Sequence, residues 1–305
     1  MRTFLFLGGS ILGLTAPAYA QDASDADAGA DEMVLASDAF EIDEDAITIT
    51  VTGNPSEVED TGQPVTVIGA EEIAQIQGPD LTRVLRRVPG VTINRTGGLG
   101  ATTGVSVRGA SNDQLLVLID GVRVADTASP AGAFDFGTLT SSNLAKVELL
   151  RGANSVIWGA DALAGVLVAS TVERSGLGGS VEAGSRSTVA SSIEGGLAGD
   201  AGFIGGSASY LTTDGFSAAA NGTEPDGFRQ FAVNGRARAY ISRTFELIGS
   251  LRYAEGTLDI DGFPAPSFTL GDTDEIQETS QLSGNVGAIY DGGALFMRGG
   301  YSFSD

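Results

Sequence analysis

The chain of 305 residues contains no cysteine and no histidine. This excludes thiol nucleophiles, imidazole general bases and the usual zinc ligands, so any metal site must consist of oxygen ligands, which suit calcium or magnesium. Basic residues are scarce too: the chain has 17 Lys and Arg but 39 Asp and Glu, which gives a formal net charge of −22. Since nucleic-acid binding needs a basic face, we expect no nucleic-acid partner.

Aromatic residues and long apolar runs are also rare. Only 7% of the residues are aromatic, whereas 44 are glycine. Beyond the first twenty residues, no segment approaches the roughly 18 consecutive apolar residues that a transmembrane helix needs. The composition therefore favours many short strands and turns over long helices.

Residues 1–20 have the layout of a secretory signal peptide. Arg2 supplies the positive charge, residues 4–14 are apolar, and Ala18-Tyr19-Ala20 forms a small-x-small cleavage site before Gln21. A buried N-terminal helix is the alternative interpretation. An exported chain without a transmembrane helix is periplasmic, secreted or a membrane β-barrel.

Residues 21–59 form a separate segment. Its first part, 21–45, has ten acidic residues and no Lys or Arg, which predicts disorder through self-repulsion and low apolar content. The run AITITVTGN follows at 46–54. Because it alternates like a strand and stands alone, its open edges invite pairing with another chain. The alternative is an ordinary first strand of the next domain.

Residues 60–172 predict a small α+β domain. A strand and a short helix are expected in 64–76, and a second helix follows Asp80, its natural N-cap, and stops at Pro89-Gly90. A glycine-rich loop lies at 96–104. The apolar run at 114–124 is broken by Asp120-Gly121, a dipeptide that suits the positive φ angles of a tight hairpin turn.

Residues 173–305 predict antiparallel membrane strands. Seven segments of about ten residues alternate between apolar and small or polar positions, which is the pattern of a transmembrane β-barrel. The long connections, at 214–229 and 256–277, fall in alternate gaps, as extracellular loops should. A soluble sandwich or a β-solenoid is the alternative.

Several motifs resemble those of one known family, the TonB-dependent outer-membrane receptors, and within it they lean toward the cobalamin (vitamin B12) receptors. The resemblance covers essentially the whole chain and is strongest from 61 to 171. The motifs are VLRRVPGV at 84–91, GGLG at 97–100, VRG at 107–109, LVLIDGVR at 116–123 and VELLRG at 147–152.

The resemblance implies a fold of two parts. An α+β plug domain, 60–172, is followed by antiparallel strands of a transmembrane β-barrel, 173–305, which in this family has about 22 strands. Seven strands are about a third of that number. We therefore expect an N-terminal portion of a longer receptor with an incomplete barrel, located in the outer membrane of a Gram-negative bacterium.

The resemblance also implies a function. It predicts energy-coupled uptake of a scarce nutrient, with cobalamin as the first candidate cargo and a ferric siderophore as the second, and no enzymatic activity. The implied partners are TonB with its inner-membrane energising complex, the lipid of the outer membrane, and the small-molecule cargo. A passive outer-membrane pore or a structural surface β-protein is the alternative from another class.

Two sets of binding residues follow from the resemblance. The predicted TonB box, which binds TonB, consists of Ile47, Thr48, Ile49, Thr50, Val51 and Thr52. The predicted cargo-binding residues of the plug are Thr96, Gly97, Gly98, Gly100, Ala101, Thr102, Thr103 and Gly104. Glycines let the backbone approach a ligand closely, and the threonines add hydroxyl groups. A second outward loop is expected at 125–134.

Charged residues supply the remaining candidates. Arg108, Glu148 and Arg151 lie in small or apolar plug segments, so partners are implied. In the family, comparable charges lock the plug to the barrel wall, and an ion pair within the plug is the alternative. The acidic long loops offer oxygen ligands for calcium, although such loops are often only solvated. The candidate ligands are Asp214, Glu224, Asp226, Asp261 and Asp272. No other cofactor is expected.

Overall fold

The computed structural model describes residues 47–48, 56–57, 63–129, 131–293 and 295–305. The predicted signal peptide and nearly all of the acidic segment lie outside these residues. Two short strands, β1 (Ile47–Thr48) and β2 (Ser56–Glu57), form an antiparallel pair. Among the described helices, none is long and apolar enough to cross a membrane.

The plug is built on a five-stranded sheet in the order β3-β8-β9-β6-β7. Strands β6 and β9 are parallel and the other neighbours antiparallel. The strands are β3 (Val65–Gly69), β6 (Leu115–Ile119), β7 (Val122–Val124), β8 (Leu144–Arg151) and β9 (Gly165–Thr171). A separate hairpin of β4 (Val91–Arg95) and β5 (Thr103–Val107) lies beside the sheet.

Short helices complete the plug. They are α1 (Ala70–Gln75), α2 (Leu81–Leu85), α3 (Ser155–Trp158) and the 3-10 helices η2 (Asn112–Gln114) and η3 (Phe136–Thr138). Asp80 caps α2 by accepting a hydrogen bond from the Thr82 amide, as predicted. The Asp120-Gly121 turn between β6 and β7 has φ angles of 49° and 80°, which confirms the predicted tight turn.

Both faces of the plug sheet are buried, which explains the continuous apolar sequence of β6. Leu115, Val117 and Ile119 face the larger core, together with α1, α2 and the β4–β5 hairpin. Leu116 and Leu118 face a smaller core that Trp158 partly covers. The plug therefore has an apolar interior of its own.

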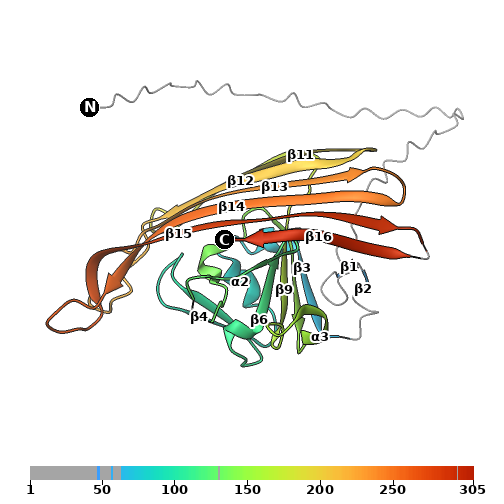
Figure 1. Cartoon of the computed structure of the whole chain (residues 1–305). Coiled ribbons are helices and arrows are strands. Elements are labelled where there is room, and N and C mark those ends of the chain that lie inside the picture. The colour runs from blue at the N-terminus through green and yellow to red at the C-terminus, as the bar shows by residue number, and fades with distance from the viewer. Residues whose placement is uncertain (1–46, 49–55, 58–62, 130, 294) are drawn as a thin grey trace, which may run out of the picture. The chain divides into compact units, whose positions relative to one another are not determined.

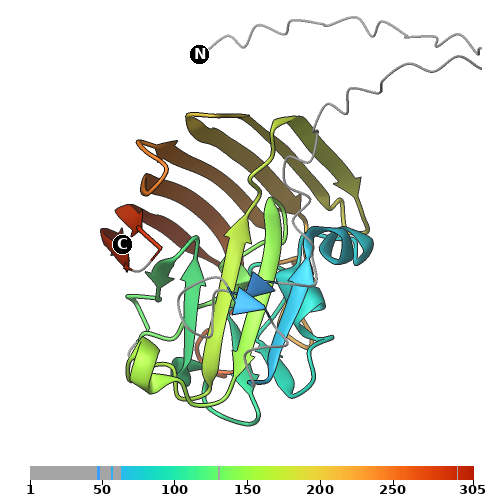
Figure 2. The ribbon, with the colours of Figure 1, turned by 90° about the vertical axis from the view of Figure 1, so that its right-hand side faces the viewer.

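The second part is one antiparallel sheet of seven strands, the wall, joined in sequence order. Its strands are β10 (Gly176–Ala183), β11 (Val189–Gly199), β12 (Gly202–Thr213), β13 (Phe228–Tyr240), β14 (Phe245–Gly262), β15 (Gly271–Asp291) and β16 (Phe296–Ser304). The wall curves over one side of the plug (Figures 1 and 2). The predicted α+β domain followed by antiparallel strands is thus confirmed.

The wall has two chemically distinct faces. Its inner face carries polar side chains that contact the plug, such as Gln230, Arg236 and Asn285. Its outer face exposes large apolar side chains, including Leu197, Ile204, Leu251, Val286 and Tyr301. Alternation of apolar-out and polar-in residues is the pattern of a strand sheet that crosses a lipid bilayer.

The predicted connection at 256–277 is wrong in its extent. Strand β14 continues to Gly262 and β15 begins at Gly271, so the loop is only 263–270. The outer face of β14 is polar at Glu255, Thr257 and Asp259, so its sequence lacks the apolar alternation of a membrane strand there, but the inner face stays apolar at Leu258. Leu258 is buried in a cluster with Phe228, and this packing extends the two strands beyond the apolar band.

We predict that Leu251→Arg destabilises the wall by about 2–4 kcal/mol, because it places a charge near the middle of the lipid-facing band. Leu251 is 52% exposed on that face and pairs across the strands with Gly235 and Gly284. The measurement is urea unfolding of the protein in phospholipid vesicles. The matched control is Thr257→Arg, on the same strand and face but opposite Arg229 and Glu278, above the band. Equal losses in both variants would contradict the assignment of the band.

Candidate functional site

Of the predicted cargo-binding stretch of the plug, 96–104, residues 96–102 form the loop that joins β4 to β5, and residues 103–104 begin β5. The 96–102 loop lies against the 214–227 loop of the wall. Gly100 has a φ angle of +83°, and a Cβ atom there would overlap the ring of Phe228. A Cβ at Gly98 would lie 3.6 Å from the ring of Phe216. Glycine at position 100 thus serves a left-handed turn and close packing against the wall at once.

The eight predicted cargo-binding residues differ in exposure. Thr96 and Thr102 are exposed, and Gly97 and Gly104 are partly buried. The others, Gly98, Gly100, Ala101 and Thr103, are buried. A role in cargo binding stays a prediction, and the exposed hydroxyls of the first pair are its most accessible groups.

The base of this loop is fixed by Asp135. One carboxylate oxygen accepts hydrogen bonds from the Thr103 and Gly137 amides, both at 2.8 Å. Burial raises the pKa of Asp135 in spite of these two hydrogen bonds. Asp135 directly follows the second predicted loop, 125–134, whose last residue, Phe134, is buried in edge-to-face contact with Phe136. The two loops are therefore joined at their bases.

An ion pair ties the same region to α2. Arg95 donates through both terminal nitrogens to Asp80, at 2.8 and 2.9 Å, and through Nε to Thr103 Oγ1. Burial alone would raise the pKa of Asp80, but the hydrogen bonds from Arg95 and Thr82 outweigh it and hold that pKa below its ordinary value. From the sequence, Asp80 is predicted only as a helix cap, and Arg95 is not predicted as its partner.

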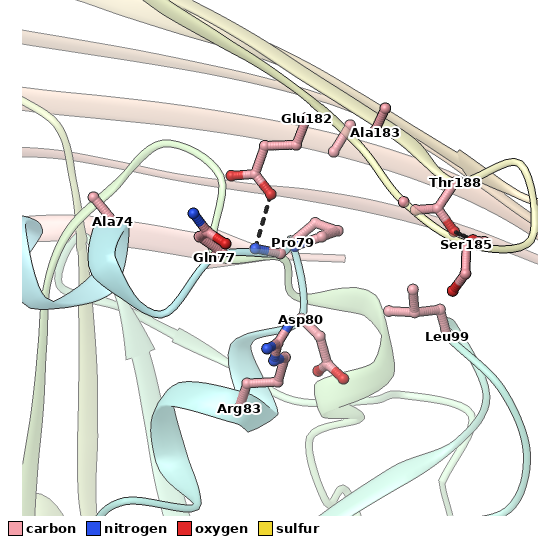
Figure 3. A pocket seen from close by; sticks show the side chains of 13 residues that line it. Ala74, Gln77, Pro79, Asp80, Arg83, Leu99, Glu182, Ala183, Ser185 and Thr188 are labelled. Carbon is pink, nitrogen blue, oxygen red and sulfur yellow. Dashed lines mark hydrogen bonds between the residues drawn. The ribbon is translucent and has the colours of Figure 1, made fainter.

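Two neighbouring clefts separate the plug from the β10–β11 end of the wall. The larger, of about 590 Å³, lies between the 77–83 segment and the wall residues 182–190. Figure 3 shows Glu182 reaching across it, where its carboxylate accepts a hydrogen bond from the Gly78 amide at 2.8 Å. The smaller, of about 370 Å³, shares Leu99, Ser185 and Thr188 with the first and adds three arginines, Arg86, Arg95 and Arg186.

The plug and wall are joined by a polar contact centred on Arg236, which we call the Arg236 node. Its guanidinium lies 2.6 Å from Glu173 and 3.4 Å from Asp120, and donates to the Thr171 carbonyl at 2.9 Å. Asp120 also accepts from the amide and hydroxyl of Thr171, and its carbonyl accepts from Asn285 of β15. Arg236 could not be predicted from the sequence, because an inward arginine on a strand has no distinctive motif.

The three predicted plug–barrel lock residues have other contacts. Glu148 is fully buried and lies 2.6 Å from Lys146 of the same strand, so an ion pair within the plug is present. Arg151 donates to the carbonyl oxygens of Pro64 and Pro89. Arg108 is exposed, with a φ angle of 53°. A locking role for these residues stays a prediction.

The predicted TonB box falls mostly outside the described residues. Only Ile47 and Thr48 are described, and they pair with Glu57 and Ser56. The backbone there is extended, as expected for a segment able to add to another sheet.

The acidic residues proposed for calcium bind backbone amides of the 214–227 loop instead of one another. Asp226, Asp261 and Asp272 accept from the amides of Ala218, Ala219 and Thr223, each at 2.7 Å. Burial, followed by repulsion from neighbouring carboxylates, raises the pKa of Asp226 against the Ala218 hydrogen bond. The other two candidates, Asp214 and Glu224, are exposed.

A calcium site is not preassembled in this loop. Across the described part of the chain, no three acidic side chains are arranged to hold one metal ion. Calcium binding stays a prediction.

Comparison with known proteins identifies the plug. Residues 57–166 match the family model of the TonB-dependent Receptor Plug Domain. The vitamin B12 transporter BtuB of Photobacterium profundum is 34% identical over 197 residues, which cover 63% of this chain and 32% of that protein. BtuB of Vibrio cholerae O1 (Classical Ogawa 395) is 40% identical over 108 residues, 35% of this chain and 17% of that protein. The chain thus spans at most about a third of these curated relatives.

Solved structures agree on the fold. FpvA of P. aeruginosa, in a heterologous pyoverdine–iron complex, has a TM-score of 0.68 at 17% identity, over 85% of this chain and 36% of that one. The alcaligin receptor FauA of Bordetella pertussis has a TM-score of 0.66 at 17% identity, over 85% and 41%. At this level of identity the likeness shows the fold alone.

We predict that Asp80→Asn lowers the free energy of unfolding by about 1–3 kcal/mol at pH 7, because Arg95 loses its charged partner. The folded pKa of Asp80 is lowered, so its stabilising effect is present in full above the unfolded value of about 3.9 and is lost as the pH falls through the folded pKa. The difference between parent and variant should therefore shrink in acid. Urea unfolding at pH 7, 5 and 3 measures it, with exposed Asp200→Asn as the control. A difference that does not change with pH would contradict the assignment.

We also predict that Arg236→Met loosens the plug from the wall by about 1–3 kcal/mol, because Asp120 and Glu173 lose their shared donor while the stem volume is kept. Hydrogen exchange of the Thr171 amide, which donates to Asp120, should become faster. Arg229→Met, on the outer face, is the matched control and should leave that amide unchanged. If both variants exchange like the parent, the Arg236 node does not hold the plug.

Proposed function

We propose that this chain, which belongs to the TonB-dependent receptors, serves energy-coupled uptake of a scarce nutrient across the outer membrane of a Gram-negative bacterium. Members of this family are transport receptors rather than enzymes, and we assign the chain no catalytic step. No resident cofactor is needed for this function.

The observation that carries the proposal is the nature of the contact between plug and wall. The plug has its own apolar core, yet much of its contact with the wall consists of hydrogen bonds and ion pairs. Each such bond contributes only about 0.5–1.5 kcal/mol net, and water can replace it when the surfaces part. A domain that is internally stable and held by replaceable polar contacts can be rearranged by force without unfolding. A passive pore needs no such domain.

Cobalamin is the first candidate cargo. It is supported by the identity to two vitamin B12 transporters, which is 34% over 197 residues and 40% over 108 residues. A ferric siderophore is the second candidate, and its support is weaker because the pyoverdine and alcaligin receptors share only the fold with this chain. In either case the cargo would enter from the side of the 214–227 and 263–270 loops, where the plug loop 96–102 lies.

The proposed energy input is a pull by TonB on residues 47–52. We predict that deleting these six residues leaves cargo binding unchanged and reduces uptake to the level of cells without TonB, because the pull no longer reaches the plug. The measurements are binding of labelled cyanocobalamin to outer membranes and its uptake by cells that express the whole receptor. If cyanocobalamin does not bind, the same pair of measurements is made with ferric siderophores.

The matched control deletes six residues of the acidic segment, 27–32, and should leave both binding and uptake intact. Undiminished uptake after deletion of 47–52 would sink the proposed coupling. Uptake that persists without TonB would favour the passive-pore alternative.

A further inference from the structure

The smaller cleft between plug and wall has an unusual charge for this chain. The protein carries a formal net charge of −22, yet the residues that line the cleft include Arg86, Arg95 and Arg186 and no Asp or Glu. Hydroxyl groups of Ser185, Thr188 and Thr213 and the backbone of Gly97, Gly98 and Gly215 complete the lining. The Thr188 and Thr213 hydroxyls already donate to the Ser185 and Arg186 carbonyls, so the Ser185 hydroxyl and the backbone of Gly97 and Gly98 are the groups that can add hydrogen bonds beside the concentrated positive charge.

Arg95 is already paired, so it helps to fix the lining of the cleft, but its charge is not available to a ligand. Its three donor groups bind Asp80 and Thr103. In contrast, neither Arg86 nor Arg186 forms an ion pair within the described part of the chain. Two guanidinium groups from opposite sides of the cleft, one from the plug and one from the wall, therefore remain available.

Arg186 is held in place without using its charge. Its guanidinium carbon lies 4.8 Å from the centre of the Phe216 ring, so the ring supports the planar face and leaves the N–H edge free. Its backbone is anchored as well, because the Arg186 carbonyl accepts hydrogen bonds from the Asp214 amide at 2.9 Å and from Thr213 Oγ1 at 3.3 Å. A fixed guanidinium loses little freedom when a ligand binds.

The acidic groups nearby are engaged elsewhere. In the adjoining larger cleft, Asp80 binds Arg95, and Glu182 binds the Gly78 amide (Figure 3). Arg83 adds a further guanidinium to that lining. A cation entering from outside would meet carboxylates that already have partners, whereas an anion would meet free donors.

We propose that this cleft, between Arg86 of the plug and Arg186 of the wall, binds an oxyanion group of the cargo. The guanidinium fork matches a carboxylate or phosphate with two parallel hydrogen bonds, and the volume of about 370 Å³ suits a small ligand or part of a larger one. Its role in transport rests on the proposed function. The shared chemistry has two sources: the carboxylates of an anionic metal chelate, or the phosphodiester of a cobalamin.

The test measures binding of two probes, citrate and dimethyl phosphate, to the whole receptor by isothermal titration calorimetry. We expect at least one probe to bind, Arg86→Gln and Arg186→Gln each to weaken it about tenfold, and the double variant to abolish it. Binding of citrate alone assigns a carboxylate cargo, and binding of dimethyl phosphate alone a phosphodiester. Arg229→Gln, on the outer face of the wall, should bind like the parent. A thermal melt of each variant checks that it is folded.

The proposal is overturned if neither probe binds, or if the folded double variant binds like the parent. These outcomes are separate from the test of the proposed function, since deletion of 47–52 leaves the cleft intact. If the probes bind only when the two arginines are present, but uptake does not need TonB, the oxyanion site is supported and the proposed transport function is refuted. If uptake needs TonB, but the probes bind equally well without the two arginines, the proposed transport function is supported and the oxyanion site is refuted.

Discussion

At the end of β9, the contact between plug and wall depends on one shared donor, the guanidinium of Arg236. It connects the Asp120-Gly121 turn, the end of β9 and Glu173, where the chain leaves the plug, to the inner face of β13. Asp120 and Glu173 lie far apart in sequence and carry the charge opposite to the arginine, and Thr171 adds a neutral carbonyl acceptor. The position of the plug sheet relative to the wall is therefore fixed where the two parts are also covalently joined.

The apolar core stabilises the plug itself, whereas the polar contacts hold the plug against the wall. The core cluster that includes Leu81, Leu85 and Leu167 is closed within the plug and does not need the wall. The wall in turn places its apolar side chains toward lipid and its polar ones toward the plug. Most of the apolar surface of each part is thus buried without the other part, and the interface between them is largely polar except where the 96–102 loop meets Phe228.

Much of the fold could be predicted from the sequence, because local chemistry controls it. Asp80 as a cap and Asp120-Gly121 as a turn follow from backbone preferences alone, and the seven wall strands follow from alternation. The extent of β14 and β15 could not be predicted, because their upper parts are stabilised by contacts between distant residues such as Phe228 and Leu258. The same limit applies to the candidate site. Glycines of the 96–102 loop stand out in sequence, whereas Arg86, Arg95 and Arg186 come together only in space.

The inner face of the wall also carries an apolar patch, formed by Ala190, Leu211, Phe228 and Leu258, and Ala101 of the plug loop covers it. If the whole plug left the wall, this patch would be exposed to water, which costs about 25 cal/mol of free energy for each square ångström of apolar surface. The polar contacts around Arg236 expose no apolar surface when they separate, and water replaces most of their hydrogen bonding. The free-energy cost of separating plug and wall is therefore uneven. It is low at the end near β9 and Glu173, where water can enter, and high at the 96–102 loop, where apolar side chains would be exposed. This difference in cost favours a rearrangement of the plug in which the 96–102 loop stays on its apolar patch while the polar contacts near Glu173 separate.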